Sequence, residues 1–546
     1  MEWTPKDDLT RLPDPGHRGG TGPVRVQRPV YQDLLPPCNL ACPAGENVQA
    51  WLSLAQSGHM REAWEALVAD NPLPAIHGRV CYHPCESACN RVPLDGAVSI
   101  HAVERYLGDR AIEEGWLPPV VAEPSGRRIL VVGAGPSGLS AAYHLARLGH
   151  TVEIRDAAPA AGGMMRFGIP AYRLPRAVLD SEVDRIRRMG VKIALNHRVE
   201  DLEREWARGR FDAVFVAVGA HLSKRTDIPA RDAGRILDAV SYLHDVEGGS
   251  APVLGRRVAI YGGGNTAMDA ARTALRMGHE PLIIYRRDRA HMPAHGFEAD
   301  EAEEEGVRIH WLRTIASIEG STFTVQVMEV DENGRPQPTG RFETLEADAL
   351  ILALGQDTDT AFLREVDGVA TKPDGTVIVD ARMMTGREGL FAGGDMVPSE
   401  RTVTVAVGHG RKAARHIDAW LDGATYEKPV PAGIATFDKL HLWFYTDVAY
   451  RPQARLALTA RAEGFEEVVQ GLTEAEALFE ARRCLSCGNC FECDGCLAAC
   501  PEDAIVKIGP GLRYRYDYDR CTGCAVCFEQ CPCHAIEMIP EPGPPT

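Results

Sequence analysis

The chain has 546 residues, which is enough for three or four domains, and its hydrophobic and charged content is ordinary for globular protein. The formal net charge of −17 argues against nucleic acid or an anionic membrane surface as a partner. No run of about 18 apolar residues occurs, and the start has neither an apolar signal core nor a twin arginine, so we expect a cytoplasmic protein. Sixteen cysteines in such a protein indicate metal ligation rather than disulfides.

The N-terminal part changes character at Cys38. Residues 1–37 are rich in Pro, Gly and charge, and we expect a poorly ordered or surface-draped extension there. Helical patterns then run from Val48 to about Ala69 and from Val98 to about Glu113. Five cysteines accompany these helices, namely Cys38, Cys42, Cys81, Cys85 and Cys89. We therefore predict an α-helical, metal-binding domain over residues 38–120.

A βαβ unit follows at residues 127–156. A buried strand, 128–132, leads directly into a G-x-G-x-x-G loop that opens a helix over 139–148, and the strand 151–155 ends in an acid. The glycines let backbone amides at a helix N-terminus approach a pyrophosphate, and the acid can accept from a ribose hydroxyl. The ADP half of FAD suits this site, and the alternative is a glycine-rich turn without ligand. The residues concerned are Gly133, Gly135, Pro136, Ser137, Gly138 and Asp156.

The same pattern recurs with a basic ending. The strand 257–261 leads into a second glycine loop and a helix to about Met277, and the strand 282–285 runs into two arginines. Arginine at this place can pair with a 2′-phosphate, which an acid would repel, so the site favours NADP(H). A solvated surface pair, or an NADH enzyme with the same arginines, is the alternative. The predicted contact residues are Gly262, Gly264, Asn265, Thr266, Ala267, Arg286 and Arg287.

Three further junctions complete the nucleotide region. Strands over 211–218 and 348–354 end at Gly219 and Gly355, which we interpret as chain crossings between two nucleotide domains. The strand ending in Gly394 and Asp395 precedes a helix that begins at Thr402, Val403 and Thr404. An acid there suits the flavin ribityl chain, and the helix N-terminus suits the negative charge of a reduced flavin ring. We thus predict an FAD domain in two parts, 125–235 and 359–425, around a NAD(P)H domain, 236–358.

The C-terminal end carries two cysteine runs of the form C-x2-C-x2-C-x3-C-P. After a linker over 426–483, which we expect to wrap back over the body, residues 484–546 hold both runs. This run is typical of [4Fe–4S] clusters, and its fourth cysteine ligates the other cluster of a pair. Zinc knuckles are the alternative. This end resembles a two-cluster bacterial ferredoxin, with one set of ligands at Cys490, Cys493, Cys496 and Cys531 and the other at Cys500, Cys521, Cys524 and Cys527.

Residues 38–425 resemble the small subunit of bacterial NADPH-dependent glutamate synthase, a module shared with the N-terminal half of dihydropyrimidine dehydrogenase and with NADPH:ferredoxin transhydrogenases. The resemblance rests on segments such as GRVCYHPCESACNR, GGMMRFGIPAYRLP, VAIYGGGNTAMDAARTAL and YRRDRAHMPA. It implies an α/β fold with two Rossmann-like domains, preceded by a helical iron–sulfur domain and here followed by a ferredoxin-like domain. It adds Gly163 and Met164 to the FAD site. It also implies hydride exchange between NADPH and flavin, with single electrons leaving through iron–sulfur clusters.

One departure from this family suggests a shared cluster. The family's C-x-x-C pair before the cysteine matching Cys38 is absent, yet a similar pair, Cys484 and Cys487, precedes the ferredoxin run. Our hypothesis is that this pair has moved and completes a cluster with Cys38 and Cys89. The resemblance then assigns a second cluster to Cys42, Cys81, Cys85 and Glu104, which leaves Cys533 alone. The alternatives are that the first cluster is lost and that Glu104 is an ordinary helix carboxylate.

The predicted protein is a flavoprotein oxidoreductase with FAD, NADP(H) or NAD(H), and four [4Fe–4S] clusters, or three without the shared one. No side-chain acid or base is required, because the cofactors supply the chemistry. We expect a ferredoxin:NADP oxidoreductase, or a diaphorase subunit of a hetero-oligomeric complex such as a 2-oxoacid oxidoreductase, with ferredoxin or a redox subunit as partner. A glutamate-synthase-type small subunit and a non-catalytic electron-wire subunit are the alternatives.

Overall fold

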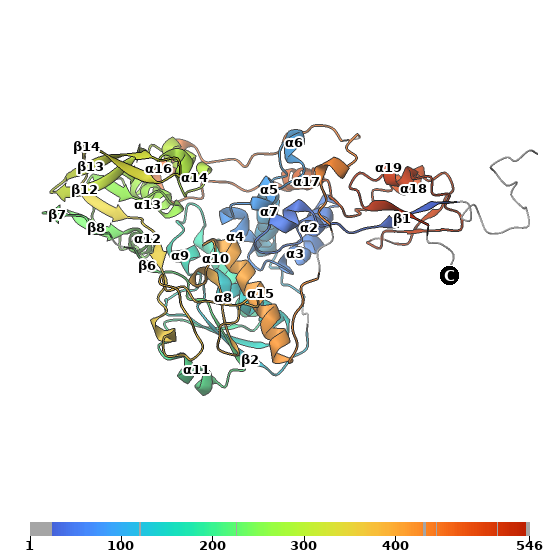
Figure 1. Ribbon diagram of the computed structural model, residues 1–546, viewed down its shortest axis with the longest axis horizontal. Helices are drawn as coiled ribbons and strands as arrows, with labels where there is room; N and C mark the ends of the chain where they lie inside the picture. Colours follow the sequence, from blue (N-terminus) through green and yellow to red (C-terminus); the bar gives the residue numbers. More distant parts are fainter. Residues whose placement is uncertain are drawn as a thin grey trace, which may run out of the picture.

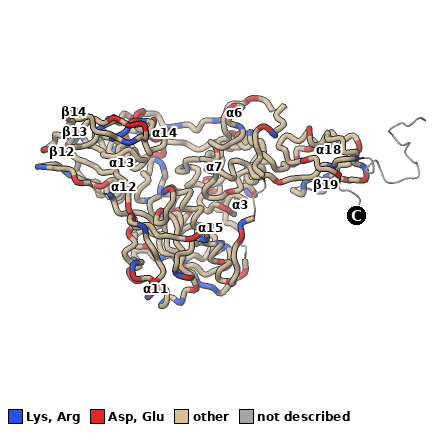
Figure 2. The backbone as a smooth tube through the Cα atoms, in the orientation of Figure 1, with Lys and Arg blue, Asp and Glu red and all other residues tan. Residues whose placement is uncertain are grey.

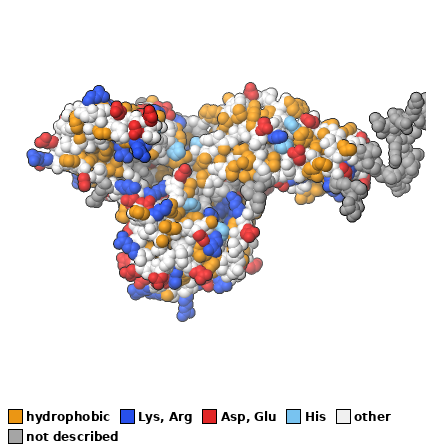
Figure 3. All heavy atoms as spheres, viewed as in Figure 1, with side chains coloured by type: hydrophobic (Ala, Val, Ile, Leu, Met, Phe, Trp, Pro, Cys, Tyr) orange, Lys and Arg blue, Asp and Glu red, His pale blue; other side chains and the backbone are white. Residues whose placement is uncertain are grey.

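The computed structural model describes residues 25–119, 122–224, 226–429, 433–443, 445–509 and 511–541. Figure 1 shows a central helical lobe from which three others project: one sheet lobe below, a second sheet lobe to one side, and a narrow arm to the other side. Acidic and basic residues are distributed over all four (Figure 2). They are also interspersed on the face shown in Figure 3. No helix in the described ranges has the length and apolar character needed to cross a membrane.

Short helices form the central lobe. They are α1 (Pro37–Ala41), α2 (Val48–Gln56), α3 (Met60–Val68), α4 (Pro74–Val80), α5 (Pro84–Ser87), α6 (Val92–Asp95) and α7 (Ile100–Glu113). The pattern expected to run from 48 to 69 is two helices, because Gly58 adopts a φ of +82° and turns the chain between them. Trp51 and Trp64, both fully buried, anchor the core that these two helices share.

The lower lobe is a five-stranded parallel sheet in the order β17-β5-β2-β3-β4. Its strands are β2 (Arg128–Val132), β3 (Thr151–Arg155), β4 (Lys192–Ala194), β5 (Ala213–Val216) and β17 (Leu390–Ala392). Its helices are α8 (Pro136–Arg147), α9 (Met164–Phe167), α10 (Arg176–Arg188), α11 (Leu202–Gly209) and α15 (Val403–Leu421). The sheet is therefore built from both segments predicted for the FAD domain, since β17 returns from beyond the second nucleotide unit.

The side lobe contains a second five-stranded parallel sheet in the order β11-β10-β9-β15-β8. Its strands are β8 (Arg235–Asp238), β9 (Arg257–Tyr261), β10 (Glu280–Tyr285), β11 (Arg308–Trp311) and β15 (Ala349–Leu352), and its helices are α12 (Ala239–Glu247), α13 (Asn265–Arg276) and α14 (Gly296–Glu304). A four-stranded sheet that the sequence reasoning missed lies beside it. Its strands are β7 (Ala230–Arg231), β12 (Arg313–Glu319), β13 (Thr322–Val330) and β14 (Pro336–Glu346).

The two chain crossings between the sheet lobes lie side by side. Strand β6 (Leu222–Ser223) follows Gly219, β16 (Gln356–Asp357) follows Gly355, and the two strands pair antiparallel. Both glycines adopt positive φ, +71° and +96°, where a side chain would be strained. The crossings therefore form a two-stranded neck between the lobes.

The arm contains a small C-terminal fold and one strand from the other end of the chain. It is built from α18 (Gly495–Ala499), β18 (Ile505–Lys507), β19 (Tyr514–Tyr516), α19 (Val526–Glu529) and β20 (Ile536–Pro540). Strand β1 (Gln27–Tyr31) pairs antiparallel with β20 over its whole length. The described part of the expected N-terminal extension is thus held in the arm's sheet by backbone hydrogen bonds. Residues 1–24 of that extension lie outside the described ranges.

The linker before the arm wraps over the body, and carries α16 (Leu458–Glu463) and α17 (Glu474–Arg482). Helix α17 packs on α2 and α7 of the central lobe. A capping box on Thr473 and Glu476 fixes its start, and at its end the Arg483 guanidinium bonds Asp95 and Glu480. The side chains of Arg483 and both partners are buried. These ion pairs fix the end of α17, and therefore the start of the segment that follows it, against the central lobe.

Candidate nucleotide and iron–sulfur sites

The first glycine loop has a shape that only glycine permits. Gly133 has a φ of +108°, and a Cβ there would lie 2.3 Å from the Ala217 carbonyl oxygen. A Cβ on Gly138 would lie 1.9 Å from the oxygen of Gly133, so helix α8 starts tightly against β2. A Cβ on Gly135 would meet nothing within 4 Å, so the backbone there faces open space. The backbone at the N-terminus of α8 is therefore open to the approach of a pyrophosphate.

The other residues expected at this site gather around the same loop. Asp156 accepts hydrogen bonds from the backbone N–H groups of Ala134 (2.5 Å) and Ala158 (2.7 Å), which fixes its carboxylate beside the loop. A Cβ on Gly163 would lie 2.9 Å from the Cα of Gly135, so the segment that starts Gly163–Met164 crosses directly over it. The hydroxyl of buried Ser137 has no partner among the described residues, which leaves a donor for a ligand.

Strand β17 brings a carboxylate to the same end of the sheet. Gly394 has a φ of +74°, and a Cβ placed on it would lie 3.0 Å from the Ser137 Cβ. Asp395 is the next residue in the chain. Burial raises the pKa of Asp395 to about 6. Helix α15 starts nearby, with the Thr402 hydroxyl accepting from the Val405 N–H (3.2 Å). Asp395 thus follows a glycine that lies against the start of α8 and close to α15.

The second glycine loop repeats this geometry between β9 and α13. Gly262 has a φ of +149°, and a Cβ there would lie 2.2 Å from the Ala353 oxygen, while Gly264 faces open space. The two expected arginines follow β10. Arg287 donates from Nε to the Tyr285 hydroxyl (2.8 Å), and Arg286 is exposed. Within the described ranges neither forms an ion pair, so both charges remain available to a phosphate.

Four cysteines from opposite ends of the chain line one cavity. Cys38 and Cys89 come from the central lobe, and Cys484 and Cys487 follow α17. Their segments are held together by Arg91, which donates to the Arg483 carbonyl (2.6 Å). Burial raises the pKa of each thiol, and the neighbouring Cys484, Cys89 and Cys487 raise that of Cys38 further, so the four side chains lie near one another.

A second group of side chains in the central lobe contains Cys42, Cys81, Cys85 and Glu104. The charge of Glu104 raises the pKa of Cys42 and of Cys81, and Cys42 and Cys81 raise that of Cys85. Glu104 is 5% exposed and accepts a hydrogen bond from the Asn71 amide (2.8 Å). The Thr404 hydroxyl at the start of α15 acts on the Cys81 thiol and lowers its pKa, against the larger effect of burial, which raises it to about 12. The first turn of α15 therefore lies beside this group.

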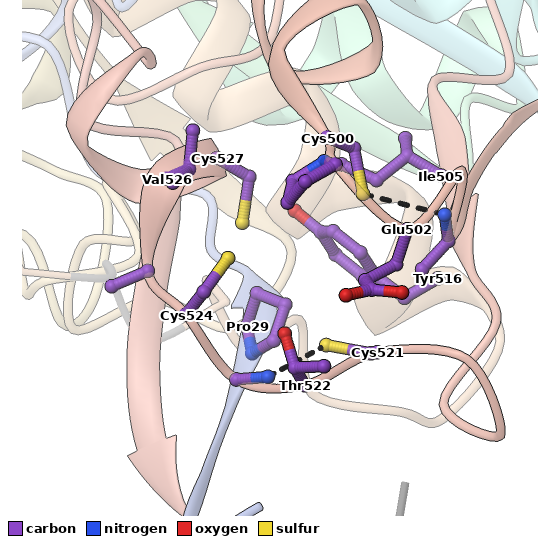
Figure 4. Close-up of a pocket in the computed structure, with 14 residues that line it drawn as sticks. Pro29, Cys500, Glu502, Ile505, Tyr516, Cys521, Thr522, Cys524, Val526 and Cys527 are labelled. Atoms are coloured by element: carbon purple, nitrogen blue, oxygen red, sulfur yellow. Dashed lines mark hydrogen bonds between the residues drawn. The ribbon is translucent and has the colours of Figure 1, made fainter. Parts of the chain in front are cut away.

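Two cysteine groups lie in the arm. The sulfurs of Cys500, Cys521, Cys524 and Cys527 point into one cavity, which Pro29 of β1 also lines (Figure 4). The other group surrounds Cys496, whose pKa burial raises to about 11, with a further rise from its three expected partners, Cys490, Cys493 and Cys531. The remaining cysteine, Cys533, is buried with its sulfur 3.8 Å from that of Cys531.

Sequence reasoning missed a set of side chains that joins these sites. Tyr82, between Cys81 and Cys85, stacks on His295 of the side lobe, with ring centroids 3.6 Å apart. Its hydroxyl accepts a hydrogen bond from the Asn265 amide (2.7 Å). Arg173 of the lower lobe, half-buried nearby, pairs with Asp269 of α13. No sequence pattern signals these contacts, because they join segments that are distant in the chain.

Two dinucleotide folds in series with buried cysteine groups define a redox protein that combines a flavin, a pyridine nucleotide and iron–sulfur centres. The family model for pyridine nucleotide-disulphide oxidoreductases matches residues 127–410, and the chain belongs to this family. The model for dihydropyrimidine dehydrogenase domain II, 4Fe-4S cluster, matches residues 31–116, and that for a 4Fe-4S binding domain matches residues 514–537. The expected fold class and the expected flavoprotein oxidoreductase activity with [4Fe–4S] electron transfer are thereby confirmed.

Three curated relatives match most of the chain. The NADP(+)-dependent formate dehydrogenase subunit beta of Moorella thermoacetica is 36% identical over 505 residues, covering 83% of this chain and 70% of that protein. The NADPH-Fe(3+) oxidoreductase subunit beta of Geobacter sulfurreducens is 34% identical over 516 residues, covering 85% and 77%. The glutamate synthase [NADPH] small chain of Azospirillum brasilense is 35% identical over 428 residues, covering 72% and 88%. These relatives confirm the resemblance drawn from the sequence motifs.

Proposed function

We propose that this chain is the NADP(H)-linked subunit of a larger redox assembly, and that it exchanges electrons with a ferredoxin or a partner redox subunit through four [4Fe–4S] clusters. The relatives support this, because each is named as a subunit or chain of an NADP(H)-linked enzyme. The arm supports it as well, because it carries cysteines and projects away from the nucleotide lobes (Figure 1). The arm is the part that a partner would meet.

The lower lobe holds FAD in this proposal. When bound, FAD exchanges two electrons as hydride with the nicotinamide and one electron at a time with iron–sulfur centres. Gly135 and the N-terminus of α8 receive the pyrophosphate, and Asp156 receives the ribose. Asp395 and the segment Thr402–Thr404 orient the ribityl chain and the ring. The open space at Gly135 and the unpartnered Ser137 hydroxyl support this fit.

The side lobe holds NADP(H). The backbone amides at Gly264 and the start of α13 receive its pyrophosphate, and Arg286 and Arg287 receive the 2′-phosphate. The absence of ion pairs to these two arginines in the described part of the chain supports the assignment, since Arg289, two residues further on, is engaged by Asp300 and Glu303. Guanidinium groups that are not paired with a carboxylate suit a phosphate that must enter and leave.

The proposed electronic connection between the arm and the body rests on one cavity. It is lined by Cys38, Cys89, Cys484 and Cys487. Four thiols around one space are what a [4Fe–4S] cluster requires. Cys42, Cys81, Cys85 and Glu104 are the proposed ligands of the second body cluster, and the arm's two runs supply the other two. The group around Glu104 lies closest to the flavin side, since Thr404 reaches Cys81.

The backbone keeps consecutive sites close together. Only Gly488 and Asn489 separate Cys487 of the shared site from Cys490 of the inner arm site. The Gly488 N–H also donates to the Cys533 carbonyl (2.5 Å), which ties the shared site to the loop that carries Cys531. These two connections hold the body and arm sites in a fixed relation, which a relay of single electrons needs.

Anaerobic titration of the purified, cofactor-loaded chain with NADPH tests the function. We expect the flavin absorbance to bleach, EPR signals of reduced clusters to appear, and a ferredoxin or a viologen dye to be reduced catalytically. NADPH that bleaches the flavin without reducing either acceptor would contradict the proposed electron exit through the arm. A flavin that NADPH does not bleach would contradict the nucleotide assignments.

A further inference from the structure

Three lobes meet at the side chain of Tyr82. This residue belongs to the central-lobe loop that carries Cys81 and Cys85, and it lies against the side lobe. Its ring stacks on that of His295 with an interplanar angle of 18°, and Phe297 lies 6.0 Å away. Burial raises the pKa of the Tyr82 hydroxyl to about 12, so the group is neutral and able to hydrogen bond at neutral pH.

The Asn265 side chain is occupied by this contact. Its amide nitrogen donates to the Tyr82 hydroxyl (2.7 Å), and its amide oxygen accepts from the backbone N–H of His295 (3.0 Å). The neighbouring Ala294 N–H donates to the Gly263 carbonyl (3.1 Å), so the loop ending at His295 is fastened to the glycine loop. The sequence predicted that Asn265 contacts the nucleotide. Its amide instead links the loop of Tyr82 to the loop that ends at His295, and we call this link the strut.

A buried charge cluster beside the strut brings in the lower lobe. The Arg173 guanidinium bonds both carboxylate oxygens of Asp269 at 2.9 Å, and it also pairs with Glu298 of α14. Arg173 follows Tyr172, which is fully buried and makes a cation–π contact with Arg276 of α13. The start of α13 is thus held between the flavin lobe on one side and the cysteine loop on the other.

We propose that Tyr82 is a positioning residue that couples the nucleotide site to the iron–sulfur loop of the central lobe. Through Asn265 and His295 it holds the second glycine loop in the orientation that binds NADP(H), and the same contact fixes the loop between Cys81 and Cys85. The inference rests on the proposed nucleotide site and on the proposed ligands Cys42, Cys81, Cys85 and Glu104. Nucleotide binding and the environment of that cluster are then linked reciprocally.

The size of the effect follows from the one hydrogen bond that a Tyr82→Phe variant removes. A partly buried hydrogen bond whose loss leaves the Asn265 amide nitrogen unpaired corresponds to about a fivefold to thirtyfold change in an equilibrium constant. The ring remains and keeps its stack on His295, so the variant tests the hydroxyl alone. We expect the Kd for NADP+ to rise by about fivefold to thirtyfold.

The experiment measures NADP+ binding to the full, cofactor-loaded chain by calorimetry. The variants are Tyr82→Phe, Asn265→Ala and the double variant, with Tyr450→Phe as a matched control at a tyrosine that is 52% exposed. If the two residues act through one contact, the double variant should bind NADP+ no more weakly than Asn265→Ala alone. Additive effects, or an unchanged Kd in Tyr82→Phe, would overturn the proposal.

A second readout does not depend on turnover. We expect NADP+ to change the EPR spectrum of the dithionite-reduced wild-type protein, and this change to be lost in Tyr82→Phe but kept in Tyr450→Phe. An NADP+-induced change that persists in Tyr82→Phe would refute the coupling while leaving the proposed function intact. A wild-type protein that binds no NADP+ would overturn the nucleotide assignment, and this coupling with it.

Discussion

Replacing both cysteines that follow α17 gives the sharpest test of how the arm is connected. In the Cys484→Ser/Cys487→Ser variant the shared cavity keeps its shape, because serine is close to cysteine in size. Arg483, which holds this segment through Asp95 and Glu480, is also unchanged. Two of the four sulfurs around the cavity are lost, however, and two thiolates cannot hold a cubane cluster.

The expected magnitude follows from the proposed ligand count. Four [4Fe–4S] clusters correspond to about 16 iron atoms per chain, so the double variant should retain about 12, with acid-labile sulfide falling in parallel. Bleaching of the flavin by NADPH should keep its wild-type rate, since no flavin or nucleotide contact is altered. Reduction of the arm clusters by NADPH, followed by EPR after rapid freezing, should slow by at least about a hundredfold, because the intervening centre is missing.

The matched control is Cys533→Ser, which also removes a buried sulfur but lies outside the proposed ligand sets. Its iron content should equal that of the wild type. An unchanged iron and sulfide content in the Cys484→Ser/Cys487→Ser variant would refute the shared cluster, and would leave these cysteines, with Cys38 and Cys89, as free thiols or ligands of something else. An equal loss of iron in Cys533→Ser would refute the ligand assignment in the arm.

The other predictions concern single side chains. Arg286→Glu combined with Arg287→Glu should lower kcat/KM for NADPH by at least about tenfold and leave that for NADH within about twofold, since the proposed 2′-phosphate contact is lost and NADH lacks that phosphate; equal losses for both would contradict the specificity assignment. Glu104→Ala should convert one cluster to a three-iron form visible by EPR in the oxidised protein, whereas an unchanged spectrum would make Glu104 only a partner of the Asn71 amide. Burial raises the pKa of Asp395 to about 6, so its charged form predominates above that pH; FAD affinity of the apoprotein should rise as pH increases through 6, and Asp395→Asn should flatten this dependence. Because the folded protein binds this proton more tightly than the unfolded chain, the apoprotein should lose stability as the pH rises from about 4 to about 6. In thermal unfolding, Asp395→Asn should show a smaller fall in Tm over this pH range than the wild type. Identical pH profiles for the two proteins would refute both statements.

The sequence by itself determined the local parts of this protein. Both glycine loops could be located because a Cβ at Gly133 or Gly262 would collide with a backbone oxygen, which restricts the position to one residue type. Arg286 and Arg287 could be assigned because the end of the second strand of a βαβ unit lies beside the nucleotide ribose. The arm could be recognised because cluster-binding cysteines lie at fixed, short spacings.

Local patterns were less reliable where a single backbone angle decides the outcome. One helix was expected over 48–69, and Gly58 divides it, because periodicity continues across a turn that a glycine can make. The four-stranded sheet beside the second nucleotide fold was not anticipated either. Its strand β14 has mostly exposed or half-buried side chains, so the alternation that marks a strand is weak there.

Only the tertiary structure decided which distant segments meet. Strand β1 completes the arm's sheet by pairing with β20, although about 500 residues separate them in the chain. The cavity of Cys38, Cys89, Cys484 and Cys487 and the strut from Tyr82 to Asn265 likewise join remote segments. Spacing rules act over a few residues, because they describe one loop around one ligand. Long-range pairing depends instead on how whole lobes pack, which is why the structure is needed to see how the nucleotide sites and the arm are connected.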